Sequence, residues 1–66
     1  MKIYINDELV SVSEDCLLRT TLAQHDLDRP GVAVAREACL VPREKWGETF
    51  LEDGDRLLVI TAAQGG

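Results

Sequence analysis

The sequence predicts an α+β domain in which one main helix packs on one face of a mixed sheet of about five strands. Three observations predict it: an alternating apolar pattern at the start, one stretch with helical spacing, and three short apolar segments after that stretch. A chain of 66 residues holds one small domain. We assign residues 1–62 to this domain and residues 63–66 to a flexible C-terminal tail.

The first two strands are predicted to form a hairpin. Residues 1–5 alternate between apolar and polar side chains, and residues 9–12 supply the returning strand. Asn6 and Asp7 lie between them and have the side chains that tight hairpin turns favour. The domain is therefore expected to begin with two antiparallel strands.

A helix is expected to follow over residues 15–26. Ser13 is the predicted N-cap, because its hydroxyl can accept a hydrogen bond from a free N–H of the first turn. Residues 28–31, Asp-Arg-Pro-Gly, break the pattern. The residues that recur at helical spacing, and so face the sheet, are Leu17, Leu18, Thr21, Leu22 and His25.

Three further strands complete the predicted sheet. The third, 32–36, turns through Glu37 and Ala38 into a short fourth, 39–41, which ends because Pro42 cannot donate to a sheet. One helical turn is expected near residues 44–46. The last strand is predicted over residues 56–62, after a turn at residues 53–55.

Composition and charge exclude several classes of function. The net charge of -5 opposes unaided binding to nucleic acid or to an anionic membrane, so a basic protein partner is expected. The longest apolar run, residues 57–60, is too short to cross a bilayer, and we expect a cytoplasmic protein. Cys16 and Cys39 have no Cys-x-x-Cys spacing and are interpreted as reduced, core-type residues.

Several short motifs together resemble a known family. They are Val-Pro-Arg at residues 41–43 followed by Trp46, Asp-Gly-Asp at residues 53–55, and the terminal pair Gly65 and Gly66. With the predicted order of elements, the chain resembles the ubiquitin-like, β-grasp sulfur carriers of thiamine thiazole synthesis, the ThiS type. The resemblance covers the whole chain.

One departure and two alternatives accompany this resemblance. Glu37 and Ala38 occupy a turn in which the family often has asparagine or glycine, so the geometry of that turn is open. The small, sulfur-carrying subunit of molybdopterin synthase shares the fold and the Gly-Gly end, although its chains are usually longer. A ubiquitin-like modifier or binding module without sulfur chemistry is the third possibility.

The resemblance implies that the working group is the carboxylate of Gly66. An adenylyltransferase of the ubiquitin-activating-enzyme type would use ATP and magnesium to adenylate it. Sulfur from a donor such as a cysteine desulfurase or a rhodanese-like protein would then give a thiocarboxylate, and thiazole synthase would consume that sulfur. The chain itself would be a carrier rather than an enzyme, with no catalytic residue, bound cofactor or metal, and a monomer when free.

The last residues are expected to thread into the partner. Gly65 and Gly66 have no β-carbon, so this end of the chain can enter a narrow channel. Fixing the backbone of Ala63, Gln64, Gly65 and Gly66 would oppose binding by roughly 4 to 8 kcal/mol. The folded domain must therefore provide a docking surface.

The last strand indicates where this surface lies, because it is apolar on both faces and one helix covers only one face. Leu57 and Val59 are assigned to the core. Leu58, Ile60 and Tyr4 are predicted to form the partner-binding patch.

Other conspicuous residues are given structural roles. Trp46 is expected to cover the open end of the core. His25 is expected to be structural, since it has no second ligand at metal spacing. Glu52, Asp53 and Asp55 are interpreted as a solvated turn rather than a metal site.

Overall fold

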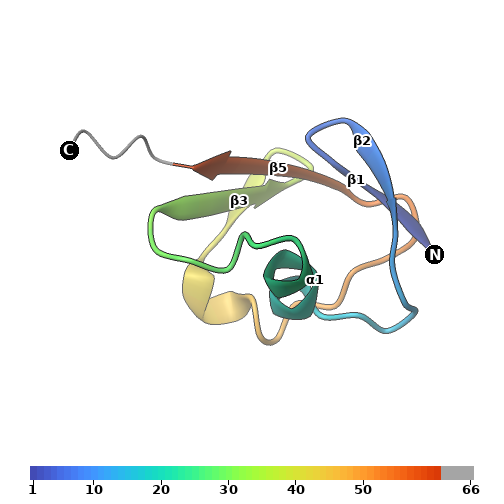
Figure 1. Ribbon diagram of the computed structural model, residues 1–66, viewed down its shortest axis with the longest axis horizontal. Helices are drawn as coiled ribbons and strands as arrows, with labels where there is room; N and C mark the ends of the chain where they lie inside the picture. The colour runs from blue at the N-terminus through green and yellow to red at the C-terminus, as the bar shows by residue number, and fades with distance from the viewer. Residues whose placement is uncertain (62–66) are drawn as a thin grey trace.

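The computed structural model describes residues 1–61. Within that range the chain forms a five-stranded sheet, one α-helix and one 3-10 helix (Figure 1). The elements in chain order are β1 (Lys2–Ile5), β2 (Glu8–Ser11), α1 (Leu18–Gln24), β3 (Val32–Arg36), β4 (Cys39–Val41), η1 (Arg43–Lys45) and β5 (Arg56–Thr61).

The strand that ends the described chain lies at the centre of the sheet. The strand order is β2-β1-β5-β3-β4, with β1 parallel to β5 and all other neighbours antiparallel. Figure 1 shows α1 lying across one side of this sheet. The prediction of an α+β fold with a mixed, five-stranded sheet is confirmed. The predicted end of the last strand, Ala62, lies outside the described residues.

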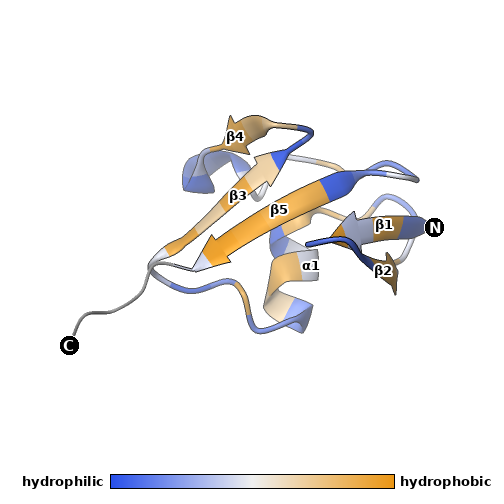
Figure 2. Ribbon diagram, turned by 90° about the horizontal axis from the view of Figure 1, so that it is seen from above, coloured by the Kyte–Doolittle hydropathy of each residue, from blue (hydrophilic) through white to orange (hydrophobic). Residues whose placement is uncertain are grey.

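The core lies between the sheet and α1. Strand β5 alternates between exposed and buried side chains along most of its length, as expected for a strand with one covered face. Figure 2 shows that β5 is nevertheless hydrophobic along most of its length. The apolar side chains buried in the core are Ile3, Ile5, Leu18, Leu22, Val32, Val34, Trp46, Leu51, Leu57 and Val59.

The predicted start of the helix is wrong. The helix begins at Leu18, and Ser13 makes no cap because the chain turns at Asp15, which has a φ of 58°. Carbonyl groups of the loop after η1 satisfy the first N–H groups: Leu18 donates to Thr49 at 2.8 Å and Arg19 donates to Trp46 at 3.1 Å. Long-range backbone contacts therefore replace the side-chain cap.

Two predictions about single side chains also need correction. Cys16 is buried as predicted, but Cys39 is exposed on the edge strand β4; both thiols are free. His25 is exposed just after the end of α1, so it is not part of the apolar face. No helix in residues 1–61 is both long and apolar enough to span a membrane.

The two hairpins have the same kind of turn. Both central residues have positive φ in each: Asn6 (52°) and Asp7 (68°) in the first, and Glu37 (48°) and Ala38 (69°) in the second. This is the pattern of a type I′ turn, which favours asparagine and glycine because other side chains are strained at positive φ. The second turn thus has this geometry as well, although Glu37 and Ala38, unlike Asn6 and Asp7, are not of the residue types that tolerate positive φ.

Replacing Ala38 by glycine is expected to stabilise the protein. Relief of the strain at φ 69° outweighs the greater freedom of glycine in the unfolded chain, for a net gain of about 0.5–1 kcal/mol in the free energy of unfolding. Thermal unfolding would show a midpoint higher by roughly 2–8 °C. The matched control is Ala23→Gly within α1, which should lose about 1 kcal/mol. A destabilised Ala38→Gly variant would contradict the expectation.

Candidate functional site

The central strand β5 leads towards the C-terminal end of the chain. Its last described residue, Thr61, pairs with Val32, the first residue of β3. The predicted tail residues Ala63, Gln64, Gly65 and Gly66 lie outside the described residues. The described part of the chain closest to Gly66 is therefore the end of β5.

The side of β5 turned away from α1 carries exposed apolar side chains. Leu58 and Ile60 are 53% and 54% exposed, whereas Leu57 and Val59 are buried beneath the sheet. The phase predicted for this strand is therefore correct. Because strand residues alternate between faces, Leu58 and Ile60 lie on the same side.

Tyr4 contributes to the same side but is half-buried. It pairs with Arg56, whose guanidinium carbon lies 4.3 Å from the centre of the tyrosine ring. Arg56 also lies 3.8 Å from the carboxylate of Asp7, an exposed and therefore weak ion pair. Tyr4 thus forms part of a surface that has a cation at its border.

Strand pairing extends this surface beyond the predicted patch. Leu58 pairs with Ala35, which pairs with Leu40 on β4, and directly paired residues share a face of the sheet. In the same way Ile60 pairs with Ala33, and Tyr4 pairs with Leu9 on β2. We call the resulting apolar surface the open face; it consists of Tyr4, Leu9, Ala33, Ala35, Leu40, Leu58 and Ile60.

Leu9 and Leu40 were not predicted as members of this surface. Leu40 is 70% exposed, and Leu9 is exposed as well. The signal that could have found them is the pairing register: a two-residue turn at Glu37 and Ala38 places Leu40 opposite Ala35. An apolar face of this kind, exposed on the sheet side, is typical of a protein-binding surface.

The Val-Pro-Arg-x-x-Trp motif stabilises the fold on the side of the sheet that α1 covers. Trp46 is only 1% exposed, and its indole N–H donates to the carbonyl of Val41 at 3.0 Å. Arg43 stacks on this indole, with its guanidinium carbon 4.8 Å from the ring centre. The prediction that Trp46 covers the core is confirmed.

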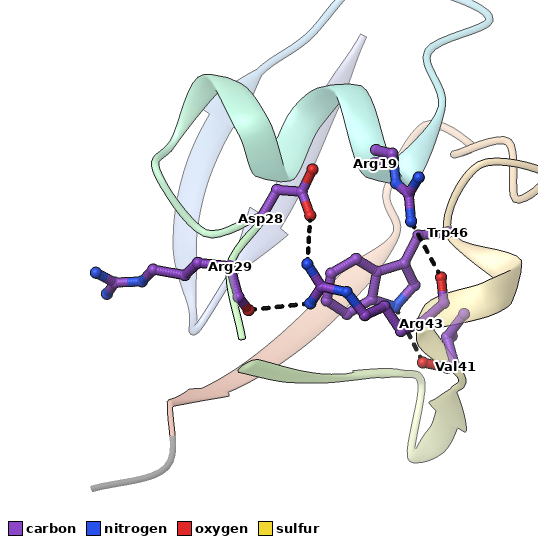
Figure 3. A network of polar contacts seen from close by, with 6 residues as sticks. All are labelled: Arg19, Asp28, Arg29, Val41, Arg43 and Trp46. Carbon is purple, nitrogen blue, oxygen red and sulfur yellow. Dashed lines mark hydrogen bonds and ion pairs between the residues drawn. The ribbon is translucent and has the colours of Figure 1, made fainter. Parts of the chain in front are cut away.

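Arg43 also connects this region to the segment after α1 (Figure 3). Its guanidinium donates to Asp28 Oδ1 at 2.9 Å and to the carbonyl of Arg29 at 3.0 Å. Arg19 on α1 donates to the carbonyl of Arg43 at 3.4 Å. The motif thus joins the helix, the segment after it and η1 around one buried indole.

The acidic turn before β5 is only partly the solvated turn that was predicted. Asp55 is buried, forms an ion pair with Arg36 at 2.7 Å, and accepts a hydrogen bond from the N–H of Glu52 at 2.8 Å. Asp53 accepts from the N–H of Lys2 at 2.8 Å. These carboxylates hold the start of β5 against β1 and β3. Within residues 1–61, no group of three or more acidic, histidine or cysteine side chains is arranged to hold a metal ion.

Comparisons with known proteins agree with this geometry. The chain is 32% identical to the sulfur carrier protein ThiS of Escherichia coli (strain K12), over all 66 residues and the full length of both chains. The fold matches the crystal structure of a thiamine biosynthesis protein (ThiS) from Geobacter metallireducens, with a TM-score of 0.83, 22% identity and full coverage of both chains.

A solution structure of a thiamine biosynthesis protein from Geobacter metallireducens matches with a TM-score of 0.80 and 22% identity, over 100% of this chain and 88% of the other. Both solved structures support the fold. The model of the ThiS family matches residues 4–66, which include the Gly-Gly end. The chain therefore belongs to the ThiS family.

Proposed function

We propose that this protein is the sulfur carrier of thiamine thiazole biosynthesis and that Gly66 carries the sulfur. The observation that carries the proposal is the position of β5: it is the central strand, its outer side is apolar, and it is the last strand before the Gly-Gly end in the sequence. The family match that reaches residue 66 and the end-to-end match to a protein named as a sulfur carrier support it. The protein is a carrier on which partner enzymes act.

The proposed chemistry takes place at the terminal carboxylate. A carboxylate is a poor electrophile because its charge is shared by two oxygens. An adenylating partner therefore joins a carboxylate oxygen of Gly66 to the α-phosphorus of ATP and releases pyrophosphate, with magnesium bound by the partner. The terminal sulfur of a cysteine persulfide on the sulfur donor then attacks the acyl carbon, the carbon–oxygen bond to AMP breaks, and an acyl disulfide forms. A partner thiol attacks the donor-side sulfur of this disulfide, so that the donor and partner cysteines become joined as a disulfide and the sulfur bonded to the acyl carbon remains on Gly66 as a thiocarboxylate.

The partners in this scheme are an adenylyltransferase of the ubiquitin-activating type, a sulfur donor and thiazole synthase. Free Cys16 and Cys39 are in keeping with a reducing compartment, and we place the carrier in the cytoplasm. The open face would supply the affinity that offsets the ordering of the tail. Burial of apolar surface is the main favourable contribution to such association.

Mass spectrometry of the protein from its native cells tests the proposal. Under thiamine starvation a fraction of the intact chain should contain one sulfur atom in place of one terminal oxygen. Fragmentation should place this sulfur on Gly66. A population that contains only the ordinary carboxylate would refute the carrier function.

Incubation with purified acceptors identifies the pathway. Thiocarboxylate protein would be mixed separately with thiazole synthase and with the large subunit of molybdopterin synthase. Consumption of the thiocarboxylate by thiazole synthase, with formation of the thiazole, is the expected result. Sulfur transfer only to the molybdopterin enzyme would overturn the thiamine assignment and leave the carrier chemistry in place.

Substitution of Ile60 by aspartate is expected to weaken docking. A charge on the open face removes apolar contact and must be desolvated at the interface, so the KM of the carrier for adenylation should rise about 10- to 30-fold. Steady-state adenylation, followed by pyrophosphate release, measures this effect. Circular dichroism would verify that the variant is folded.

The matched control for Ile60→Asp is Phe50→Asp. Phe50 is about as exposed as Ile60, at 58%, but it lies on the helix side, where its backbone forms a bridge with Leu17. The control variant should keep the original KM. An unchanged KM for folded Ile60→Asp would show that the open face does not bind the adenylating enzyme.

A further inference from the structure

Strand β5 is longer than its parallel neighbour. The pairing between β1 and β5 stops at Ile5 and Leu57, where β1 turns into the first hairpin. From Val59 to Thr61, β5 pairs with β3 on one side only. Within this segment Val59 is buried, so its backbone groups on the second side need another hydrogen-bonding partner.

The side chain of Asn6 supplies that partner. Its Nδ2 donates to the carbonyl of Val59 at 3.2 Å, and its Oδ1 accepts from the N–H of Val59 at 2.8 Å. The two backbone bonds before it are Tyr4 N–H to Asp55 O at 2.8 Å and Asn6 N–H to Leu57 O at 2.9 Å. The amide of Asn6 thus continues the ladder for one more step, with the donor and acceptor of a peptide group.

Val59 lies between Leu58 and Ile60, the two exposed apolar side chains that β5 contributes to the open face. We propose that Asn6 is a positioning residue, which holds the final part of β5 straight so that the open face and the start of the tail keep a fixed relation during docking. This inference rests on the proposed carrier function. It assigns to Asn6 a role beyond its place in a turn.

The backbone and the side chain of Asn6 have different roles, which substitutions can separate. Its backbone has a φ of 52°, which glycine also adopts readily, whereas only its side chain can bond to Val59. Asn6→Gly therefore keeps the turn and removes both hydrogen bonds. Asp7→Gly is the matched control, because it places glycine at the other central position of the same turn and keeps the amide of Asn6.

Amide hydrogen exchange tests the structural part. In Asn6→Gly the N–H of Val59 should exchange about tenfold faster or more, relative to core amides such as that of Val34, because its partner is lost. In Asp7→Gly the ratio of these two rates should stay within about twofold of the original. Equal protection of Val59 in the original protein and in Asn6→Gly would overturn the proposal.

Adenylation kinetics test the functional part, at a temperature where both variants are fully folded. Asn6→Gly should raise the KM of the carrier about tenfold, since binding must now order the end of β5. Asp7→Gly should leave it unchanged. An unchanged KM for Asn6→Gly would refute the positioning role. Absence of adenylation of the original protein would instead refute the proposed function, and the exchange result would still decide whether Asn6 holds β5.

Asn6→Asp should restore the two hydrogen bonds to Val59 at low pH only. The N–H of Val59 can donate to the introduced carboxyl group in either of its forms, whereas only the protonated form can donate to the carbonyl of Val59, whose oxygen repels the carboxylate. The pKa of the introduced carboxyl should therefore rise above the ordinary value of about 3.9. Its protonated form restores the donor, and the stabilisation is present at low pH and lost as pH rises through the shifted pKa. The gap in unfolding midpoint between Asn6→Asp and the original protein should therefore narrow as pH falls. A gap independent of pH would contradict the paired hydrogen bonds.

Discussion

Trp46→Ala is expected to leave most of the protein unfolded at physiological temperature. The side chain is almost completely buried and donates to the carbonyl of Val41, so its removal leaves a large cavity and loses this hydrogen bond. Truncating a buried aromatic side chain typically lowers the free energy of unfolding by about 3–5 kcal/mol. A domain of this size is rarely more stable than that. Urea unfolding followed by circular dichroism measures the loss.

Two further variants make this expectation specific. Trp46→Phe keeps much of the volume but loses the indole N–H, and it should fold with a loss of about 1–3 kcal/mol. Phe50→Ala removes an aromatic side chain that is mostly exposed and should change stability by about 0.5 kcal/mol or less. Stability of Trp46→Ala close to that of Phe50→Ala would contradict the structural role of the motif.

The strands and the covered face were predictable because their signals are local. Residues 1–5 alternate in polarity, and in the last strand, which is apolar on both faces, the polar side chain of Arg56 marks the open side; the helix covers the face that contains Leu57 and Val59. Proline and glycine mark the breaks between elements. Local pattern was therefore sufficient for the order of elements, for the burial of Trp46 and for the exposure of Leu58 and Ile60.

The start of the helix depends on contacts that are distant in sequence. Ser13 is a suitable cap by type, but the N–H groups of Leu18 and Arg19 bond to carbonyls of Thr49 and Trp46. A chain segment some thirty residues away thus takes the place of the local cap. Tertiary contacts commonly override local preference in this way.

Long-range pairing also explains the side chains whose roles were missed. Asp55 looks like a turn residue until β3 brings Arg36 beside it. Asn6 likewise has a turn signature, and only the parallel pairing of β1 and β5 brings its amide to Val59. Leu40 joins the open face through its register with Ala35. In each case the sequence contains the right side chain, and the sheet order determines its function.

Deletion of Gly66 is expected to abolish sulfur loading while the domain stays folded. The shortened chain still ends in a glycine carboxylate, on Gly65, so the reacting group is chemically the same. It lies about 3.5 Å nearer to the domain, the length of one extended residue. Because a misplacement of about 1 Å can reduce a rate roughly 100-fold, loading should fall by about 1000-fold or more. Formation of the thiocarboxylate by the adenylating enzyme and sulfur donor, followed by mass spectrometry, measures the loss.

Gly66→Ala separates the effect of the length of the tail from the effect of its width. This variant keeps the carboxylate at its normal distance from the domain and adds one β-carbon. Any loss of sulfur loading would therefore indicate that the channel in the partner is narrow. Because both changes lie beyond the core and beyond the last described pair, Thr61 with Val32, neither should alter the unfolding midpoint. Loading of the deletion variant within tenfold of the original would show that sulfur loading does not depend on the distance from the open face to the carboxylate. The same result would weaken the positioning role of Asn6, because a fixed end of β5 affects loading only if loading depends on that distance.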